Sequence, residues 1–445
     1  MIHNKNFKNY LDLKPFGGIE NVTKNMFVYE FGNDIMLVDC GIGFPDKTTP
    51  DEEFILPDFS YLEKNKHRIR GLVVTHAHFD HYGATPNLLT KISVPVFTSK
   101  LTAEFIKIKA KEMGIKGKHI DFRIIDPKLS QIKIGSFKVT PFHINHSVPE
   151  ALGLFIETPI GNIFHVADYK FDFTPIDEEP FDIHKVSLLA ANKKPVLLLS
   201  DCLGAAKEGH TQSEATIQEV LENIMIRAKG LMVVTTLSTN ISRIKQAIKA
   251  SANAGRKVAF VGRSLEQTSE IAKNLGYFSS LRDFVLPAKK IKRYPFSKLT
   301  IIAAGSYAQT NSALLKMSKN KHHLIKLKKD DVVVFSADPS PPGVLVGVNK
   351  MIDDLTRLGT RVYYYEIQDN LHVSGHGTAE DIKMLISITK PQYLMPIGGD
   401  YRHMAAFSVI AQKMGYQEKQ VLLLREKQKI QINSQNQVIV NNQNG

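Results

Sequence analysis

The sequence predicts an α/β protein built from roughly three structural units, or from two units of which one is inserted in the other. Its 445 residues exceed the about 150 residues of one typical domain. The 43% of hydrophobic and 23% of charged residues are ordinary for a globular protein and exclude a disordered or fibrous chain. Short apolar runs also alternate with segments of helical spacing, which is typical of layered α/β domains.

The first expected elements are strands. Apolar runs at 27–31 and 35–38 flank the turn Gly32-Asn33-Asp34, and this arrangement predicts a β-hairpin. Residues 71–74 (Gly-Leu-Val-Val) predict a third, buried strand. Helix-like and strand-like segments then alternate as far as residue 200.

The middle of the chain predicts a second, parallel-sheet domain. Helical apolar spacing at 214–229 and 242–254 alternates with strand-like runs at 231–234 and 258–261. This region also holds the densest basic segments, which are either a solvated face or a rim that faces a polyanion. Their members are Lys289, Lys290, Lys292, Arg293, Lys316, Lys319, Lys321, Lys326, Lys328 and Lys329.

The pattern after residue 350 is again α/β. Helices are expected at 351–358 and 379–387, and strands at 361–367 and 393–397. Residues 438–440 (Val-Ile-Val) predict a last edge strand with a frayed end.

Charge, cysteine count and hydropathy limit the classes of function. Lys and Arg number 57 against 44 acidic residues, a net charge of +13 that favours polyanionic partners such as nucleic acid; the alternative is a basic surface that only aids solubility. Two cysteines exclude a disulfide framework and a four-cysteine zinc site. No run reaches the ~18 apolar residues of a membrane helix, and the N-terminus lacks a signal-peptide core, so a cytoplasmic protein without membrane contact is expected.

The strongest chemical signal is the run Thr-His-Ala-His-Phe-Asp-His at 75–81, directly after the strand expected at 71–74. His76 and His78 are two residues apart and project to the same side of an extended chain. Asp80 and His81 follow as the chain turns toward a helix that is expected to have Thr85 as its cap and Pro86 at its first position. Nitrogen and oxygen ligands without thiolate predict a hydrolytic zinc site.

One motif supplies too few ligands, so further ones are expected downstream. His146 follows the apolar stretch 137–142 and can complete one metal site. Asp168 ends the run 162–167 and can bridge two metals with one carboxylate. His143 and His165 lie inside apolar runs and are expected to be structural.

The motif His-Ala-His-Phe-Asp-His resembles the signature of the metallo-β-lactamase fold. The wider sequence is similar to the ribonuclease J family, whose metallo-β-lactamase domain carries an inserted β-CASP domain. The matching stretches follow in consistent order at 38–45, 56–62, 145–149, 167–172, 200–201, 240–243, 262–264, 372–377 and 390–397.

The resemblance implies an αββα sandwich with an inserted α/β domain. It places the first part of the metallo-β-lactamase domain at 1–206, the β-CASP domain at 207–351 and the second part of the metallo-β-lactamase domain at 352–445. It implies that the partner is single-stranded RNA. It also implies that the chain forms either a homodimer or a complex with a paralogue. The C-terminal domain of full-length bacterial members lies beyond this chain.

The resemblance also assigns roles to residues. His76, His78 and His146 would hold a first Zn²⁺, Asp80 and His81 a second, and Asp168 both; Mn²⁺ is the alternative metal. Asp80, Asp201 and His376 would take part in catalysis, with His376 as the proton donor. The role of Asp201 has two alternatives, because its carboxylate would either orient a metal ligand or His376, or cap a helix. RNA phosphate would be contacted by His372, Ser374, Gly375, Asn240 and Arg243.

One departure from the family pattern concerns the second metal. Gly398 occupies the position of a metal-binding histidine, so the second site keeps Asp80, His81 and Asp168 and is expected to be weaker. His403, five residues further on, is a candidate replacement.

Three functions follow from these observations. The first is a zinc-dependent ribonuclease, acting as a 5′-to-3′ exonuclease, an endonuclease or both, in which a metal-bound hydroxide hydrolyses the phosphodiester bond. The second is a catalytically weakened RNA-binding paralogue. The third is a metal-dependent hydrolase of another phosphodiester.

Overall fold

The computed structural model divides the chain into two compact units, of which the second is inserted in the first. The first unit comprises Met1–Phe173, Glu178–Thr211 and Gly375–Gly445, and the second comprises Thr174–Asp177 and Gln212–Ser374. The structure describes residues 10–44, 54–115, 120–128, 131–176, 178–338 and 344–443.

Two mixed sheets form the centre of the first unit. The eight-stranded sheet has the order β20-β19-β1-β2-β3-β4-β5-β6, and the six-stranded sheet has the order β18-β11-β10-β9-β8-β7. The strands of the first sheet are β1 (Tyr10–Gly17), β2 (Met26–Phe31), β3 (Asp34–Val38), β4 (Ile69–Val73), β5 (Val96–Thr98), β6 (Phe122–Ile124), β19 (Gln428–Asn433) and β20 (Val438–Asn442). Those of the second are β7 (Ile132–Ile134), β8 (Phe137–His143), β9 (Leu152–Glu157), β10 (Asn162–Val166), β11 (Leu197–Asp201) and β18 (Tyr393–Ile397).

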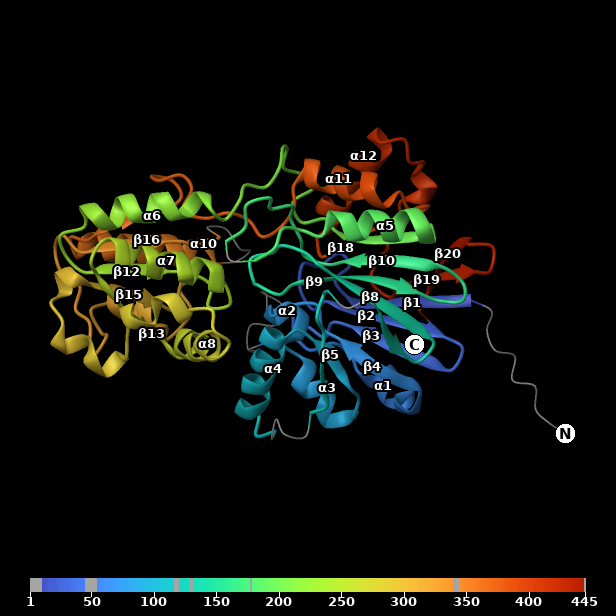
Figure 1. The fold of residues 1–445 in the computed structure, drawn as a ribbon, viewed down its shortest axis with the longest axis horizontal. Helices are drawn as coiled ribbons and strands as arrows, with labels where there is room; N and C mark the ends of the chain where they lie inside the picture. Colours follow the sequence, from blue (N-terminus) through green and yellow to red (C-terminus); the bar gives the residue numbers. More distant parts are fainter. Residues whose placement is uncertain are drawn as a thin grey trace. The chain divides into compact units, whose positions relative to one another are not determined.

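Helices cover the outer faces of both sheets, so the first unit has four layers in the order helix, sheet, sheet, helix (Figure 1). Side chains of both sheets, such as Phe27, Tyr29, Phe142 and Phe164, share one buried apolar cluster. One helical layer contains α5 (Ile183–Lys193), α11 (Ala379–Thr389) and α12 (Tyr401–Lys413). The other contains α1 (Ser60–Lys64), α2 (Phe79–Tyr82), α3 (Thr85–Lys91) and α4 (Lys100–Glu112).

A parallel sheet forms the centre of the second unit. Its strand order is β14-β13-β15-β12-β16-β17, and all of its paired strands are parallel. The strands are β12 (Met232–Thr235), β13 (Lys257–Val261), β14 (Val285–Leu286), β15 (Leu299–Ala303), β16 (Val332–Phe335) and β17 (Arg361–Tyr363). The helices are α6 (Thr216–Arg227), α7 (Ile241–Asn253), α8 (Arg263–Asn274), α9 (Ala313–Ser318) and α10 (Leu345–Arg357).

Most of the predicted elements are present. The hairpin is formed by β2 and β3, which pair antiparallel around the turn at Gly32. The parallel sheet of the middle region is confirmed, and β20 lies at the edge of the eight-stranded sheet as expected. The strand expected at 361–367 ends at Tyr363, because the backbone turns at 365–367.

One prediction about a helix end is wrong, and one of the two alternatives for Asp201 is excluded. Thr85 is the first residue of α3 and makes no capping hydrogen bond, since Ala84 precedes the helix. Asp201 does not cap a helix, because the next described helix, α6, begins at Thr216.

Candidate metal centre

The loop between β4 and α2 carries the first group of candidate ligands. The apolar strand β4 ends at Val73, and the chain remains buried through Thr75, His76 and Ala77. His78 has extended backbone angles and directly precedes the short helix α2, which contains Asp80 and His81. The change from strand to helix within a few residues therefore directs four polar side chains toward one region.

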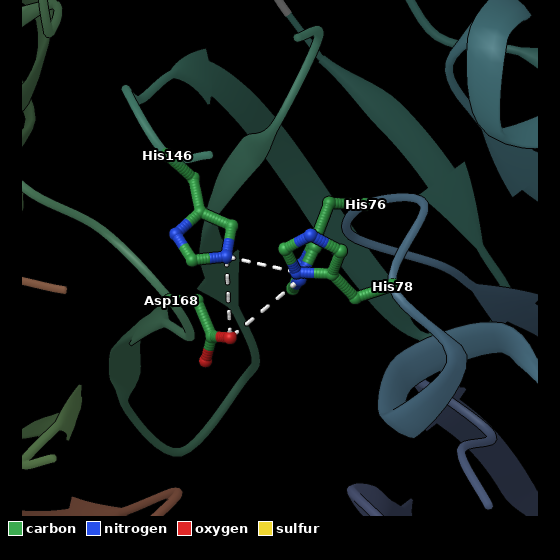
Figure 2. A group of neighbouring side chains, drawn as sticks. All are labelled: His76, His78, His146 and Asp168. Carbon is green, nitrogen blue, oxygen red and sulfur yellow. Dashed lines mark hydrogen bonds and ion pairs between the residues drawn. The ribbon is translucent and has the colours of Figure 1, made fainter. Parts of the chain in front are cut away.

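Four side chains from three segments meet beside this loop (Figure 2). Ligand atoms of His76, His78, His146 and Asp168 all lie within 4.8 Å of one another. Nε2 of His146 lies 3.0 Å from Nδ1 of His78 and 3.5 Å from Oδ2 of Asp168. Asp168 follows β10, and His146 follows β8, so two strands of the second sheet supply the partners of the loop.

A second group contains Asp80, His81 and Asp168. Nε2 of His81 lies 3.4 Å from Oδ2 of Asp168 and 3.6 Å from Oδ2 of Asp80. The same oxygen of Asp168 lies 3.6 Å from Nε2 of His76, which belongs to the first group. One carboxylate is thus shared by both groups, as a bridging ligand must be.

A third group joins Asp168 to Asp201 and His376. Nδ1 of His376 lies 2.7 Å from Oδ2 of Asp201, and the other oxygen of Asp201 accepts a hydrogen bond from the Leu203 amide. Asp201 is buried at the end of β11, whereas 22% of the His376 side chain is exposed. The pair therefore has one fixed member and one member that reaches solvent.

Hydrogen bonds on the far side of each imidazole orient the lone pairs of His146, His81 and His76. Nδ1 of His146 donates to the carbonyl of Gly375 at 2.7 Å, which leaves Nε2 as the lone-pair atom. Nδ1 of His81 lies 2.7 Å from Oδ2 of Asp39. Nδ1 of His76 lies 3.0 Å from Oγ1 of Thr75, whose proton is donated to Asp39. Partners of this kind orient metal-binding histidines.

Burial keeps the histidines of the first group neutral. It lowers the pKa of His76 and of His146 well below the ordinary value, and it lowers the pKa of His78 to about 3. Charged neighbours add smaller effects of both signs. A neutral imidazole has the lone pair that a metal ligand needs.

Negative charge is concentrated at the shared carboxylate. Burial raises the pKa of Asp168, but the positive charges of His81 and His376 outweigh burial and hold that pKa well below its usual range. Burial raises the pKa of Asp80 to about 6, with His81 opposing the rise and Asp168 adding to it. Burial lowers the pKa of His376, but Asp201 and Asp168 outweigh it and raise the pKa to about 9.

The residues present fit a divalent metal. Nε2 of His76 is buried and has no hydrogen-bond partner, because the nearest carboxylate oxygen, that of Asp168, is 3.6 Å away. Leaving a buried polar atom unpaired costs about 1–3 kcal/mol. A cation among the imidazoles and carboxylates would remove this cost, and imidazole with carboxylate is a ligand set that zinc accepts.

Gly398, which is expected from the resemblance to stand at the position of a histidine, lies beside the shared carboxylate of this centre. Its φ of +69° is a left-handed conformation, and its amide donates to the carbonyl of Gly18. A Cβ at this position would lie 3.8 Å from Oδ1 of Asp168 and of Asp201. A side chain at 398 would therefore start beside the shared carboxylate, and among the described residues no other atom apart from the chain neighbours lies within 4 Å of this Cβ.

His403 does not replace the missing histidine. Its Nδ1 accepts a hydrogen bond from the Asp400 amide at 3.2 Å and forms the capping box of α12. Among the described residues, the three groups of candidate metal ligands do not include it. His143 and His165 also lie outside these groups; they contact the Glu179 carbonyl and the Tyr29 hydroxyl.

The residues that are expected to contact RNA phosphate differ in their burial and in their contacts. Gly375 packs against the His146 ring so closely that a Cβ would lie 2.7 Å from it, and its carbonyl orients that ring. His372 and Ser374, in the second unit, are partly exposed. Asn240 is buried at the start of α7, where its side chain accepts the Arg243 amide at 2.9 Å.

Arg243 requires a correction, because its side chain is 0% exposed. Nε and Nη2 donate to Oε2 of Glu214, at 3.1 and 2.7 Å. Nη1 lies within hydrogen-bond distance of the carbonyls of Ser336 and Leu371. The guanidinium group joins three segments of the second unit and is not available to solvent, so the expected direct contact with RNA is not supported.

Sequence reasoning missed three polar residues beside the centre. Asp39 accepts hydrogen bonds from the Thr75 amide at 2.7 Å and from the Thr75 hydroxyl at 3.0 Å, in addition to its contact with His81. Nδ2 of Asn25 lies 3.1 Å from Nε2 of His81. Among these residues, only Asp39 had a signal in the sequence, which was its position directly after β3. No sequence pattern predicted the positive φ of Asp39.

Three family profiles match the chain. The metallo-beta-lactamase superfamily matches residues 20–211, the ribonuclease J beta-CASP domain matches 229–355, and the Zn-dependent metallo-hydrolase RNA specificity domain matches 363–422. The profiles follow one another in the order expected for an inserted domain.

Several curated relatives are similar over most of the chain. Ribonuclease J2 of Bacillus subtilis is 34% identical over 92% of this chain and 73% of its own length. Ribonuclease J of Thermus thermophilus is 33% identical over 94% of this chain and 73% of its own length. Ribonuclease J of Helicobacter pylori is 34% identical over 95% of this chain, which spans 61% of that relative.

A solved structure shares the fold. The crystal structure of a protein of unknown function from Enterococcus faecalis superposes with a TM-score of 0.63, at 15% identity, over 95% of this chain and 99% of its own. Among the helices that the structure describes, none has the length and apolar character to cross a bilayer. The chain belongs to the ribonuclease J family, with a metallo-β-lactamase domain that carries an inserted β-CASP domain.

Proposed function

We propose that the chain is a metal-dependent ribonuclease that hydrolyses phosphodiester bonds of single-stranded RNA with Zn²⁺, or Mn²⁺, at the metal centre. One observation carries the proposal. Asp168 belongs to all three groups of titratable side chains, so candidate ligands for two cations and a candidate proton donor converge on one carboxylate. The relatives named ribonuclease J support RNA as the substrate.

In this proposal His76, His78 and His146 would hold one cation, Asp80 and His81 would hold the other, and Asp168 belongs to both ligand sets. When bound, divalent cations supply Lewis acidity, which acidifies water and stabilises negative charge that develops on the phosphate. The hydrogen-bond acceptors on Asp39, Thr75 and Gly375 hold the Nδ1 protons of His81, His76 and His146, and so keep the lone pairs of these imidazoles pointed inward.

His376 is the proposed proton donor to the leaving oxygen of the RNA. It is the partly exposed member of the third group, so a substrate atom can approach its ring. The 2.7 Å contact with Asp201 fixes a proton on Nδ1 and leaves Nε2 to face the substrate. Asp201 then acts through His376 as a positioning residue.

Gly398 favours a second candidate function, a relative that binds RNA but cleaves it slowly. Without a side chain at 398, the second cation has three protein ligands, and a site of three ligands binds metal less tightly. A hydrolase of another phosphodiester is the third alternative. We propose the cytoplasm as the compartment, since both cysteines are free thiols.

The family domains are proposed to meet at the boundaries predicted from the sequence, 1–206, 207–351 and 352–445. In the division into compact units, the chain re-enters the first unit at Gly375, which is later than the predicted boundary at 352. Residues 352–374 thus belong to the second compact unit, although the proposed boundaries assign them to the metallo-β-lactamase domain.

The test is metal analysis and RNA degradation on one sample of the purified chain. We expect between one and two bound metal ions, degradation of 5′-monophosphorylated single-stranded RNA, and little cleavage of DNA of the same sequence. His76→Ala should abolish degradation, whereas His184→Ala, a change at an exposed position on α5, should not.

Each contrary result selects an alternative. Bound metal with RNA binding but no cleavage would indicate the weakened paralogue, and equal cleavage of DNA or of a small phosphodiester would indicate the third function. The lengths of the products separate the modes of cleavage, because an exonuclease releases mononucleotides and an endonuclease releases fragments.

A further inference from the structure

The second unit carries a concentration of positive charge that the metal centre does not use. Between residues 288 and 329 the sequence has eleven Lys and Arg residues and no Asp or Glu. All eleven side chains are exposed. We call this set the insert basic face; its members are Lys289, Lys290, Lys292, Arg293, Lys298, Lys316, Lys319, Lys321, Lys326, Lys328 and Lys329.

Two separate segments contribute to the insert basic face, and both pack on the same side of the parallel sheet. Ile291 of the first segment and Met317, Ile325 and Leu327 of the second belong to one buried cluster. That cluster also contains sheet residues such as Val333. Lysines from two separate segments are therefore anchored over one sheet face.

Packing of the apolar residues directs the lysines outward. Ile291 is 0% exposed between Lys290 and Lys292, and Leu327 is buried between Lys326 and Lys328. Because neighbouring side chains in these segments alternate between core and solvent, the charges cannot turn inward without breaking the apolar cluster. The exposure of the lysines is thus a consequence of the fold.

The ion pairs of the described part of the chain leave this positive charge unneutralised. Among the residues that the structure describes, none of the eleven forms an ion pair. Asp331, beyond the end of the segment, is buried and accepts hydrogen bonds from the Leu231 and Lys328 amides. Burial lowers the pKa of His322, and the nearby charges of Lys316 and Lys326 lower it further. Uncompensated charge of this density attracts polyanions.

We propose that the insert basic face binds the sugar–phosphate backbone of RNA, independently of base sequence, as an anchoring surface separate from the metal centre. The proposal extends the proposed function, because it takes the same class of substrate. Ionic contacts from Lys and Arg to phosphates supply affinity without reading bases.

The chemistry of the face favours RNA over other anionic partners. No large apolar side chain between 288 and 329 is among the strongly exposed ones. A membrane-surface segment inserts apolar side chains between lipids, and a protein interface is centred on buried aromatic or apolar anchors. A backbone of phosphates needs neither.

The test is the binding of a fluorescent 30-nucleotide single-stranded RNA, measured by anisotropy in the full chain carrying His76→Ala so that the probe stays intact. The first test variant changes four members of the face to Gln: Lys316, Lys319, Lys321 and Lys326. The second changes Lys289, Lys290, Lys292 and Arg293 to Gln. The matched control changes four exposed lysines of the first unit to Gln: Lys111, Lys133, Lys138 and Lys413.

Both test variants should bind the RNA about tenfold or more weakly at 0.1 M salt. The slope of log K against log[salt] should fall by about 3, since each lost phosphate contact on a single strand removes about 0.7. The control should change neither quantity by comparable amounts. Melting temperatures should match in all three variants, because surface substitutions have small effects on stability.

Three outcomes would overturn the inference. They are an unchanged affinity and salt slope in both test variants, an equal loss in the control, or binding of phosphatidylglycerol vesicles that depends on these lysines while RNA binding does not. Degradation by the chain without His76→Ala is measured in parallel. Absence of cleavage would contradict the proposed function, but the anisotropy result would still decide the anchoring surface.

Discussion

Oδ2 of Asp39 lies 2.7 Å from Nδ1 of His81, although the two residues are 42 positions apart. The contact orients the imidazole so that Nε2 faces Asp80 and Asp168. We expect Asp39→Asn to weaken metal binding about 10–100-fold, because the partner of a ligating histidine contributes that much affinity. Metal titration by calorimetry measures this. Asp12→Asn, at a carboxylate that is also buried but bonds to Gln431, is the control and should leave affinity unchanged.

A histidine at 398 should strengthen the second metal position. The Cβ would start 3.8 Å from the oxygens of Asp168 and Asp201, so an imidazole can reach the shared carboxylate. The positive φ costs about 1–2 kcal/mol for a residue with a Cβ. Gly398→Ala introduces the same backbone strain without a ligand and is the matched control.

Metal content and degradation rate measure the effect of this change. Gly398→His should bind closer to two metal ions per chain than the original protein, and Gly398→Ala should not. Equal occupancy in the two variants would show that position 398 does not correspond to the histidine of the family pattern.

Loss of the His376 ring should slow cleavage without removing metal. General acid catalysis contributes about 10²–10⁴-fold, so His376→Ala should lower kcat by that factor. Asp201→Asn should lower kcat less, because it alters the orientation of a donor that remains. Single-turnover cleavage with parallel metal analysis measures both. A loss of metal equal to the loss of rate would instead assign His376 to the ligands.

Arg243 should matter for the stability of the inserted unit. Arg243→Met would leave the buried Glu214 without its guanidinium partner, at a cost of about 3–5 kcal/mol. Urea unfolding followed by circular dichroism measures this cost, and hydrogen exchange in β16 locates it. Lys249→Met, an exposed change on the same helix, should have almost no effect.

Glu30 should make stability depend on acid pH. Burial raises its pKa, but hydrogen bonds from Lys14, Tyr61 and Arg68 outweigh burial and lower the pKa from 4.5 to about 2. Its stabilisation is therefore complete above pH 4.5 and is lost as the pH falls toward 2. Glu30→Gln should cost about 2 kcal/mol at pH 7.

Urea titrations at several pH values measure the difference between Glu30→Gln and the original chain, which should shrink between pH 4.5 and pH 2. The control, Glu63→Gln, removes an exposed pair with Lys91 and should cost less than 1 kcal/mol. A difference that is independent of pH would show that the Glu30 cluster acts by packing and not by charge.

Local patterns were sufficient for the elements and for the core of the metal centre. The turn at Gly32 joins two apolar runs, and the spacing of His76, His78, Asp80 and His81 after a buried strand already predicts convergent ligands. Both depend on neighbours within a few residues, where strand and helix periods determine the direction of side chains. The resemblance implied that Arg243 contacts RNA, but a motif match does not indicate whether a side chain is buried, and the Arg243 side chain is.

The sequence by itself determined the α/β class, the order of the elements, the family and the set of candidate ligands, since these follow from periodicity, spacing and motif order. Only the tertiary structure decided the pairing of Asp39 with His81, of Gly375 with His146 and of Arg243 with Glu214. Such pairs join segments that meet through the packing of sheets and helices. Their distances depend on the whole hydrophobic core, and no local pattern records them.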